Sequence, residues 1–335
     1  MRKAKKIGAL SILLAMGLMT ACGNEKTAST SEGSKGSTHP FTIAYSGGTC
    51  EAPLYIAYEK GFFKDEGLDV NLVKMDFEQL KSGISSDKVD ATVGNFAWFK
   101  PIEQGLGVKL TAGVHAGCIQ AVTPKSSGIA SIKDLKGKTI GVDTIGGGPM
   151  ITMSIELQKH GIDPKKDVSW KAYPPPQLAS AADKKEIDAF IVWDPHGQKA
   201  LDGNQYNRLL NIAHDEPYHS GYCCYSVVSA KLVEQDPKKA AAFTRAILRG
   251  AEWVGEHPQE TAQLEVDKKY VGADVELNAK LLKDYTWKPS VKRAEESVKF
   301  FIHEQKSQGI LEASTDENEL FTKIFAEVIP DYKGN

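Results

Sequence analysis

Four cysteines beyond the N-terminal region have the most distinctive chemistry in this chain. They are Cys50, Cys118 and the neighbours Cys223 and Cys224, and His115 lies three residues before Cys118. Thiolates with imidazole are soft ligands that suit zinc, copper(I) or a related metal. The spacing matches no closed zinc-finger pattern, so only the fold could bring these residues to one ion. Two further histidines near Cys223 are also candidates: His214 and His219.

Other interpretations of these cysteines stay open at this stage. Free cysteine is common as a small buried residue, and it could also line a site for an organic ligand. A Cys50–Cys118 disulfide would brace the fold of an exported protein. Cys223 and Cys224 are adjacent, so in a strand we expect their side chains on opposite faces. A cysteine with His115 as base could be catalytic. However, G-x-S-x-G, phosphate-loop and H-E-x-x-H motifs are missing from the sequence, and we expect no enzyme.

Two strand–turn–helix units would position such residues. In the first, the strand FTIAYS (41–46) leads through a Gly-rich turn into a helix that begins near Pro53, and a second strand follows at 68–75. The second unit has a strand at 139–142, a Gly-rich turn and a helix at 150–160. Ligands of α/β sheets bind at the carboxyl ends of strands, and a helix N-terminus offers N–H groups to an anion.

The remaining pattern is also α/β. Further strands are predicted at 91–96, 108–114, 119–124, 168–172, 188–196 (with a closing turn) and 221–229. Helices are predicted at 77–90, 98–106, 177–185, 237–257, 259–270, 275–285 and 291–309, so that the chain is almost wholly helical from residue 230 onwards.

The N-terminus has the features of an export signal. Residues 1–21 combine a basic start with a short apolar core, which is typical of a secretory signal peptide. The sequence LMTAC, ending at Cys22, resembles a bacterial lipobox, in which a diacylglyceryl group is placed on the cysteine. The alternative is ordinary cleavage that leaves Cys22 as a spare thiol. Residues 22–38 contain no large apolar side chain and are predicted to form a flexible tether.

Composition limits the organisation and the partners of this 335-residue chain. A net charge of −2 with interspersed acidic and basic residues argues against nucleic acid and against a polybasic membrane surface. The length exceeds one typical core, so two domains are expected. We expect a monomer that touches the membrane through its lipid anchor.

Three stretches resemble a known family of transport proteins. They read APLYIAYEKGFFKDEGLDV from Ala52, IKDLKGKTIGV from Ile132 and DAFIVWDP from Asp188, after a lipobox and tether. This arrangement resembles the solute-binding lipoproteins of nitrate/sulfonate/taurine-type ABC importers, which include binders of a thiamine pyrimidine precursor. The resemblance covers nearly the whole mature chain. It implies an α/β, two-lobed fold like that of type II periplasmic binding proteins, with a ligand cleft between the lobes.

The resemblance also implies boundaries and partners. Lobe one would comprise residues 39–122 with 227–335, and lobe two residues 123–226. The two crossings, near 118–123 and 222–229, would form the hinge. The ligand would pass to the transmembrane subunits of an ABC permease. Its ATPase subunits would hydrolyse ATP, because this chain has no nucleotide-binding motif.

In this family the ligand contacts come mostly from turns after strands. Carried over by position, the resemblance implies contacts from Ser46, Gly47, Thr49, Cys50, Asn95, Ala97, Thr144, Gly146, Gly147, Trp193 and Asp194. If that fold holds, the distant cysteines can meet Cys50 at the floor of the cleft. That convergence would add His115, Cys118, Cys223 and Cys224.

The ligand itself stays open. A sulfonate-, nitrate- or taurine-like anion or a small organic nutrient follows from the resemblance. However, the predicted cleft segments contain no arginine, which is the usual residue for gripping such anions. The alternative is a thiophilic metal, zinc or copper(I), or a metal complex, held by Cys50, Cys118, Cys223 and Cys224. A Cys/His enzyme on the same fold is a remoter alternative, and no resident cofactor is expected.

Cys22→Ala should release the protein from membranes without changing its fold. Two or three acyl groups hold a protein firmly at a membrane, whereas the variant would have no residue to carry them. The measurement is membrane fractionation after a salt wash, with circular dichroism as the check on folding. Full retention of the variant in the membrane fraction would contradict the lipid anchor.

Overall fold

A computed structural model of the chain describes residues 40–332. The predicted signal peptide (1–21), the lipidation site Cys22 and the tether (22–38) lie outside the described residues. Within residues 40–332, none of the helices has both the length and the apolar character needed to cross a membrane.

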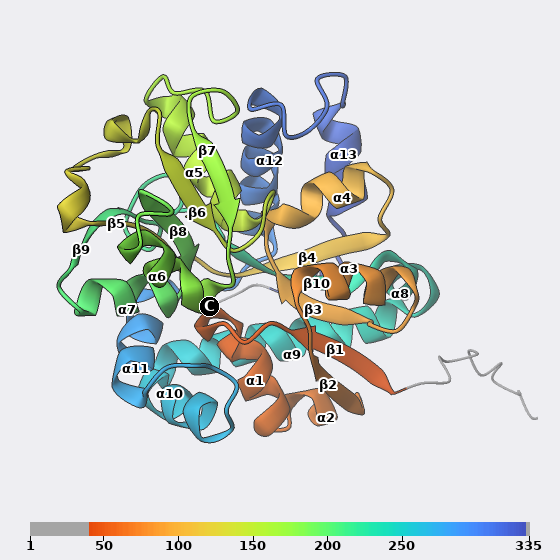
Figure 1. Ribbon diagram of the computed structural model, residues 1–335. Helices are drawn as coiled ribbons and strands as arrows, with labels where there is room; N and C mark the ends of the chain where they lie inside the picture. The colour runs from red at the N-terminus through yellow and green to blue at the C-terminus, as the bar shows by residue number, and fades with distance from the viewer. Residues whose placement is uncertain (1–39, 333–335) are drawn as a thin grey trace, which may run out of the picture. The chain divides into compact units, whose positions relative to one another are not determined.

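Two mixed five-stranded sheets organise the described chain (Figure 1). The first has the order β2-β1-β3-β10-β4 and the second β7-β6-β8-β5-β9. The strands are β1 (Phe41–Tyr45), β2 (Val70–Lys74), β3 (Ala91–Gly94), β4 (Val108–His115), β5 (Ile119–Pro124), β6 (Thr139–Val142), β7 (Ser169–Ala172), β8 (Ala189–Trp193), β9 (Tyr206–Asn211) and β10 (Cys224–Ser229). In each sheet three strands run parallel, and one antiparallel strand, β10 or β5, joins them to the edge strand. The predicted α/β class is confirmed.

The helices begin where the sequence supplies capping groups. Aspartate side chains accept helix N–H groups at the starts of α3, α9, α11 and α13, and proline occupies the first turn of α1, α9 and α10. The helices are α1 (Ala52–Glu59), α2 (Phe62–Asp65), α3 (Phe77–Ser85), α4 (Phe99–Glu103), α5 (Gly148–Lys159), α6 (Leu178–Asp183), α7 (His196–Asp202), α8 (Ala230–Gln235), α9 (Pro237–Glu256), α10 (Pro258–Asp267), α11 (Val275–Asp284), α12 (Lys292–Ser307) and α13 (Glu317–Ile324).

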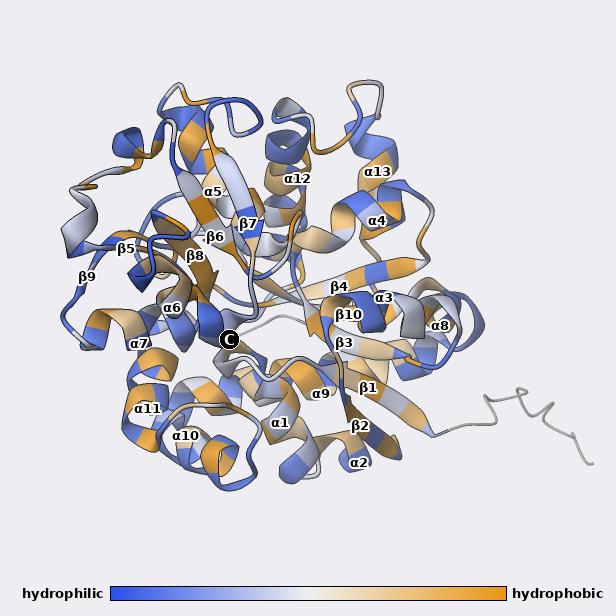
Figure 2. Cartoon of the chain, viewed as in Figure 1, coloured by the Kyte–Doolittle hydropathy of each residue, from blue (hydrophilic) through white to orange (hydrophobic). Residues whose placement is uncertain are grey.

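Burial follows strand position in each sheet. All of β10 and nearly all of β8 are buried, and both strands lie inside their sheets. The edge strand β7 is mostly exposed, and Figure 2 shows it in paler, more hydrophilic colours than β8. Inner strands covered on both faces need continuous apolar runs, whereas an edge strand tolerates polar side chains.

The chain changes sheets twice. It leaves the first sheet after β4, which ends at His115, and enters the second at β5, which begins at Ile119. It leaves the second sheet after β9 and re-enters the first at β10, which begins at Cys224. The predicted lobes, 39–122 with 227–335 and 123–226, stay a prediction, but the sheet changes fall a few residues before both predicted boundaries.

Several element predictions differ from the structure. The helix predicted from Pro53 onwards is divided into α1 and α2 at Gly61, whose φ of 81° is incompatible with a continuing helix. The predicted helix 77–90 ends at Ser85, because the chain turns there and Asp87 has a φ of 57°. Helix α7 and strand β9 were not predicted, and α8 and α13 were covered only by the general prediction of a helical chain from residue 230 onwards. In β9, the polar residues of YNRLLN obscure the two-residue period.

Close helix packing supports the core of the first sheet. One continuous hydrophobic cluster includes Ile43 of β1, Ile140 of β6 and Leu248 of α9, so apolar side chains from both sheets share it. Helix α9 crosses α1 at Gly250, where an added Cβ would meet the Pro53 carbonyl group well inside the 3.0 Å that real Cβ atoms keep. Backbone therefore faces backbone at this crossing, and no side chain can rotate away to make room.

Gly250→Ala should destabilise the protein by about 1–3 kcal/mol through overpacking, despite the better helix propensity of alanine. A decrease of a few degrees in Tm is expected for a chain of this size. Gly272→Ala is the matched control, because a Cβ there meets no atom within 4 Å. Equal thermal unfolding of the two variants would show that the helices separate at no cost.

Candidate functional site

A cavity of about 760 Å³ lies where strands of both sheets end. In the first sheet its lining follows β1, β2 and β3, and in the second sheet it follows β6, β7 and β8. Its lining residues come from the segments 46–51, 74–80, 93–98, 143–148, 172–175 and 193–196, together with Cys224. All these segments lie at the carboxyl ends of parallel strands, where α/β sheets bind ligands.

The turns of the two sheets approach each other closely beside this cavity. A Cβ added to Gly148, at the start of α5, would lie 2.7 Å from the ring of Trp193 and 3.0 Å from Oδ1 of Asn95. Asn95 follows β3 of the first sheet, whereas Gly148 and Trp193 belong to the second. A molecule in the cavity can therefore touch residues from both sheets at once.

Most of the predicted site residues line the cavity. They are Ser46, Gly47, Cys50, Asn95, Ala97, Thr144, Gly147, Trp193, Asp194 and Cys224. The others that were predicted are not part of its lining: Thr49, His115, Cys118, Gly146 and Cys223. The Thr49 hydroxyl donates instead to Asn278 in the core, at 2.6 Å. The N–H of Gly146 donates to the sulfur of Met150. Contact between the lining residues and a ligand remains a prediction.

The predicted anion site in the first turn is filled by the chain itself. The carboxylate of Glu51, which is 5% exposed, accepts the N–H groups of Ser46, Gly47 and Gly48 at 2.7–3.0 Å. It also accepts hydroxyl hydrogen bonds from Ser46 and Tyr55. These N–H groups are the ones that an oxyanion would need, so Glu51 competes with any anionic ligand at this turn.

An acidic side chain also lies at the second turn. Asp143, directly after β6, accepts a hydrogen bond of 3.0 Å from the indole N–H of Trp193, and its other carboxylate oxygen is buried without a hydrogen-bond partner in the described chain. Burial raises the pKa of Asp143 above its ordinary value, although the hydrogen bonds oppose this shift. The N–H of Gly147 is also used, because it donates to the carbonyl of Thr144.

The cavity lining carries more negative than positive groups. Its acidic members are Glu51, Asp76, Glu78, Asp143 and Asp194, against the basic residues Lys74 and His196. Burial raises the pKa of Asp194 to about 7, although hydrogen bonds from Tyr285 and Gln120 lower it. Burial lowers the pKa of His196 to about 4, and Lys199 adds to this effect, so the imidazole is neutral at pH 7. The lining contains no arginine, as predicted.

Aromatic and apolar residues that were not predicted form much of the remaining lining. Phe77 and Trp98 meet edge to face with ring centroids 4.9 Å apart, and Tyr173 and Pro174 contribute from the turn after β7. The rule that predicted the site applies equally to the turns after β2 and β7. The predicted contacts came only from strand ends with a Gly-rich or polar turn, so the turns after β2 and β7 were not included.

Behind the cavity, four potential metal ligands converge. One ligand atom each from Cys50, His115, Cys118 and Cys224 lies within 4.8 Å of all the others, and all four residues are buried. Cys223 is not one of these four, although its sulfur lies 3.2 Å from that of Cys118 and 3.8 Å from that of Cys224. All four cysteines of the described chain are free thiols.

The two sheet changes bring together Cys50, His115, Cys118 and Cys224, which we call the thiol–imidazole cluster. His115 ends β4, Cys118 precedes β5, and Cys224 begins β10 opposite His115 in the antiparallel pairing. Cys50 arrives from the short 3₁₀ helix η1 (Thr49–Glu51) after β1. The prediction that Cys223 and Cys224 point to opposite faces is wrong. Cys223 precedes the strand, so the alternation of β10 does not yet apply to it.

The other predicted histidines are not part of the cluster. His214 forms an ion pair with Asp284 at 2.9 Å, and the ring of His219 bonds to the Ala213 carbonyl at 2.7 Å. The ring of His115 instead stacks on Tyr285 and contacts Trp287, while its Nε2 lies 3.0 Å from the carbonyl oxygen of Cys50.

Protons are shared unevenly within the cluster. The contact with Cys118 lowers the pKa of the Cys50 thiol. The contact with Cys224 and burial raise it by more, so the pKa is about 12. The contact with Cys118 holds the pKa of Cys224 below its ordinary value. Burial lowers the pKa of His115, but the charge of Cys224 and contacts with the thiols raise it to about 10. Within the cluster the pKa values of Cys50 and His115 are therefore raised, whereas that of Cys224 is lowered.

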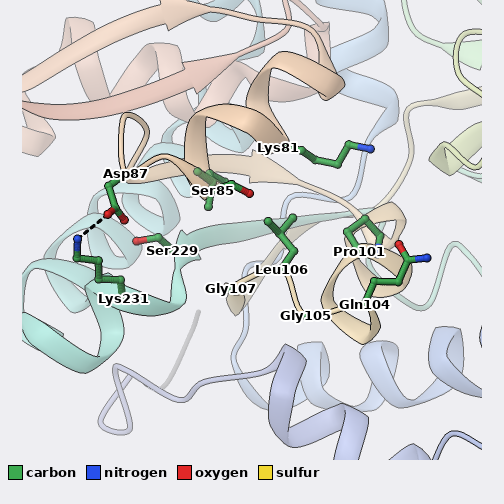
Figure 3. A pocket seen from close by; sticks show the side chains of 11 residues that line it. Lys81, Ser85, Asp87, Pro101, Gln104, Gly105, Leu106, Gly107, Ser229 and Lys231 are labelled. Atoms are coloured by element: carbon green, nitrogen blue, oxygen red, sulfur yellow. Dashed lines mark hydrogen bonds and ion pairs between the residues drawn. The ribbon is translucent and has the colours of Figure 1, made fainter.

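A second hollow of about 560 Å³ lies at the opposite strand ends of the first sheet (Figure 3). Gly107, just before β4, and Ser229, the last residue of β10, line it. Lys231 and Asp87 pair beside it at 2.7 Å. It is made by one sheet alone and lies away from the carboxyl ends of β1 and β3, so it is the weaker candidate.

Comparison with known proteins finds similar chains that are named for binding small solutes. It is 27% identical over 263 residues to a Bacillus subtilis (strain 168) protein named for binding aliphatic sulfonates, which covers 74% of this chain and 77% of that protein. The periplasmic nitrate-binding protein NrtA from Synechocystis PCC 6803 superimposes with a TM-score of 0.74 at 17% identity, over 85% of this chain and 86% of NrtA.

A third similar protein is the ligand-binding component of an ABC-type import system from Staphylococcus aureus, solved with zinc bound. Its TM-score is 0.71 at 14% identity, over 87% of this chain and 97% of that one. At such identities the two structures show the fold alone, and they confirm the predicted periplasmic-binding-protein fold. The relatives are binding proteins, in agreement with the prediction that the chain is not an enzyme. A family model described as NMT1/THI5 like matches residues 49–261, more than half of the sequence. The chain therefore belongs to the NMT1/THI5-like family.

Proposed function

We propose that this protein is the solute-binding component of an ABC importer and captures its solute in the cavity between the two sheets. The observation that carries the proposal is the cavity of about 760 Å³ lined by turns after three strands of each sheet. A solute that touches both sets of turns favours the state in which they face each other, so binding shifts an open–closed equilibrium. The names of the Bacillus and Staphylococcus relatives support the transport role.

The proposal includes an extracytoplasmic location. The protein would be anchored to the cell membrane through a lipid on Cys22 and would act as a monomer, with residues 22–38 as the tether. It would deliver its solute to the transmembrane subunits of a permease, and the ATPase subunits of that permease would supply the energy. The export features of residues 1–22 support this arrangement.

The lining favours a solute that is neutral or cationic and has an apolar part. Relatives are named for sulfonates and nitrate, but here Glu51 fills the first N–H site and Asp143 lies at the second turn. Lys74 is the one lysine in the lining, and arginine is not among the lining residues. A desolvated anion would meet several carboxylates without a bidentate cation to offset them. The aromatic rings of Phe77, Trp98 and Trp193 supply the apolar contact.

Titration with a solute panel tests the proposed function. The panel contains taurine, an alkanesulfonate, nitrate, and neutral and cationic aromatic nutrients, and thermal shift and calorimetry measure binding. A bound solute should change tryptophan fluorescence, because the ring of Trp193 lines the cavity. Trp193→Ala should weaken binding about tenfold through lost ring contact.

Trp170→Ala is the matched control for this variant. Its indole N–H donates to the Pro164 carbonyl, and the residue is not part of the cavity lining. Wild-type affinity in Trp193→Ala, for a solute that binds the wild type, would remove this cavity from the proposed function. A solute that is chemically converted while bound would indicate an enzyme.

Glu51→Ala should empty the N–H site of the first turn. The partly buried N–H groups of Ser46, Gly47 and Gly48 would lose a charged acceptor, at a cost of about 1–3 kcal/mol. Chloride or sulfate should then bind these groups and raise the Tm of the variant, whereas wild-type Tm should respond much less. The check is thermal unfolding across salts at constant ionic strength.

Asp134→Ala is the control for Glu51→Ala. Asp134 also accepts backbone N–H groups, from Ala130 and Ser131, but it is exposed, so water replaces it at little cost. Identical anion dependence in the two variants would show that the Glu51 site is not a distinct anion-binding turn.

A further inference from the structure

The thiol–imidazole cluster defined above meets the cavity at its floor. Cys50 and Cys224 line the cavity, whereas His115 and Cys118 are fully buried directly behind them. The four donors come from four separate segments, yet their ligand atoms all lie within 4.8 Å of one another. A set of four donors this close, two of which line the cavity, is more than packing requires.

The spacing of the donors fits a metal coordinated by sulfur. Four-coordinate zinc has Zn–S distances of about 2.3 Å, which places two sulfur ligands roughly 3.8 Å apart. The sulfurs of Cys118 and Cys224 are 4.0 Å apart. His115 is already oriented, because its Nε2 can donate to the Cys50 carbonyl oxygen at 3.0 Å. Its Nδ1 lies 3.6 Å from the sulfur of Cys223 and 3.4 Å from the Ala116 carbonyl oxygen, and a metal bound through Nδ1 would replace these weak contacts.

The backbone is strained at the point where it delivers one of these thiols. Cys118 has a φ of 113°, and the preceding Gly117 has a φ of 95°. A non-glycine residue rarely adopts this conformation, and such strain persists where the surrounding structure holds it in place. The strain sits at the first sheet change, between β4 and β5.

We propose that Cys50, His115, Cys118 and Cys224 bind one thiophilic metal ion, of the zinc or copper(I) type, as part of the solute captured in the cavity. Each coordinating thiol releases its proton to water, and His115 binds through a neutral ring nitrogen. The inference rests on the proposed function, since it names the ligand class of the same cavity. The apolar lining above the ion leaves room for an organic group carried by the metal.

Metal binding at this position would couple directly to the arrangement of the sheets. His115 and Cys224 end and begin strands of the first sheet, and Cys50 follows β1 of that sheet. Cys118 lies at the first sheet change, directly before β5 of the second sheet. One ion bound to all four would therefore tie the entry to the second sheet to the first sheet.

A redox pair is the competing use of these thiols. The sulfurs of Cys118 and Cys223 are 3.2 Å apart, close enough for oxidation to a disulfide after a small movement. However, the S–H of Cys223 contacts the Gly117 carbonyl oxygen, which removes this thiol from the four-donor set. Cys223 therefore serves as a matched control for Cys224.

The test uses reduced wild-type protein freed of metal with a chelator. Zinc, and copper(I) with a competing chelator, are titrated while bound metal, accessible thiols and Tm are measured. We expect one ion per chain, protection of the cluster thiols and a Tm that rises with metal concentration. Cobalt(II) should give the sulfur-to-metal charge-transfer absorption of thiolate coordination. Cys224→Ser and Cys50→Ser should each lower affinity at least about 100-fold, whereas Cys223→Ser should stay within about threefold.

The outcomes separate this inference from the proposed function. Equal metal affinity in all three variants would overturn the site, as would a Cys118–Cys223 disulfide together with failure of the reduced protein to bind either metal. If an organic solute closes the protein and neither metal binds, the inference fails and the proposed function stands. Metal could bind through these thiols while neither metal nor any solute changes the radius of gyration measured by small-angle X-ray scattering. In that case the metal site is structural, and the proposed transport role fails.

Discussion

The antiparallel pairing of β10 with β4 is the interaction on which the site depends. It places Cys224 opposite His115, at the point where the chain leaves the first sheet and returns to it. Since β10 also pairs with β3, the same strand holds the turn that carries Asn95 beside these crossings. A shift of this pairing by one residue would turn the side chain of Cys224 to the other face and separate the cluster. The cavity floor is thus a product of strand register.

Glu51 occupies the backbone N–H groups of the turn after β1. A turn with three convergent N–H groups at a helix N-terminus is ready to hold an anion, and here the anion belongs to the protein. Asp143 adds a second carboxylate directly after β6, and one of its oxygens is buried without a hydrogen-bond partner among residues 40–332. A shared fold leaves ligand preference open, because that preference depends on the side chains that line the cavity.

Much of the fold follows from local patterns. The strands at 119–124 and 139–142 have the predicted bounds, because apolar runs there are bounded by proline and glycine turns. The long C-terminal helices were also predicted, since their apolar faces repeat at helical spacing. The break at Gly61 was missed because the apolar pattern continues through it. Among site residues, the rule for strand ends found Asn95 and Trp193 but gave no reason to single out Phe77.

The sequence by itself determined the family fold, the number of soft donors and the lack of arginine near the predicted turns. Tertiary structure alone decided that Cys50, His115, Cys118 and Cys224 meet while His214 and His219 pair elsewhere. It also decided that Glu51 fills the anion site. The physical reason is that hydrophobic periodicity reports which face of an element is buried, and not which distant element covers it. Donors far apart in sequence come together through long-range strand pairing, and that pairing depends on the packing of both sheets.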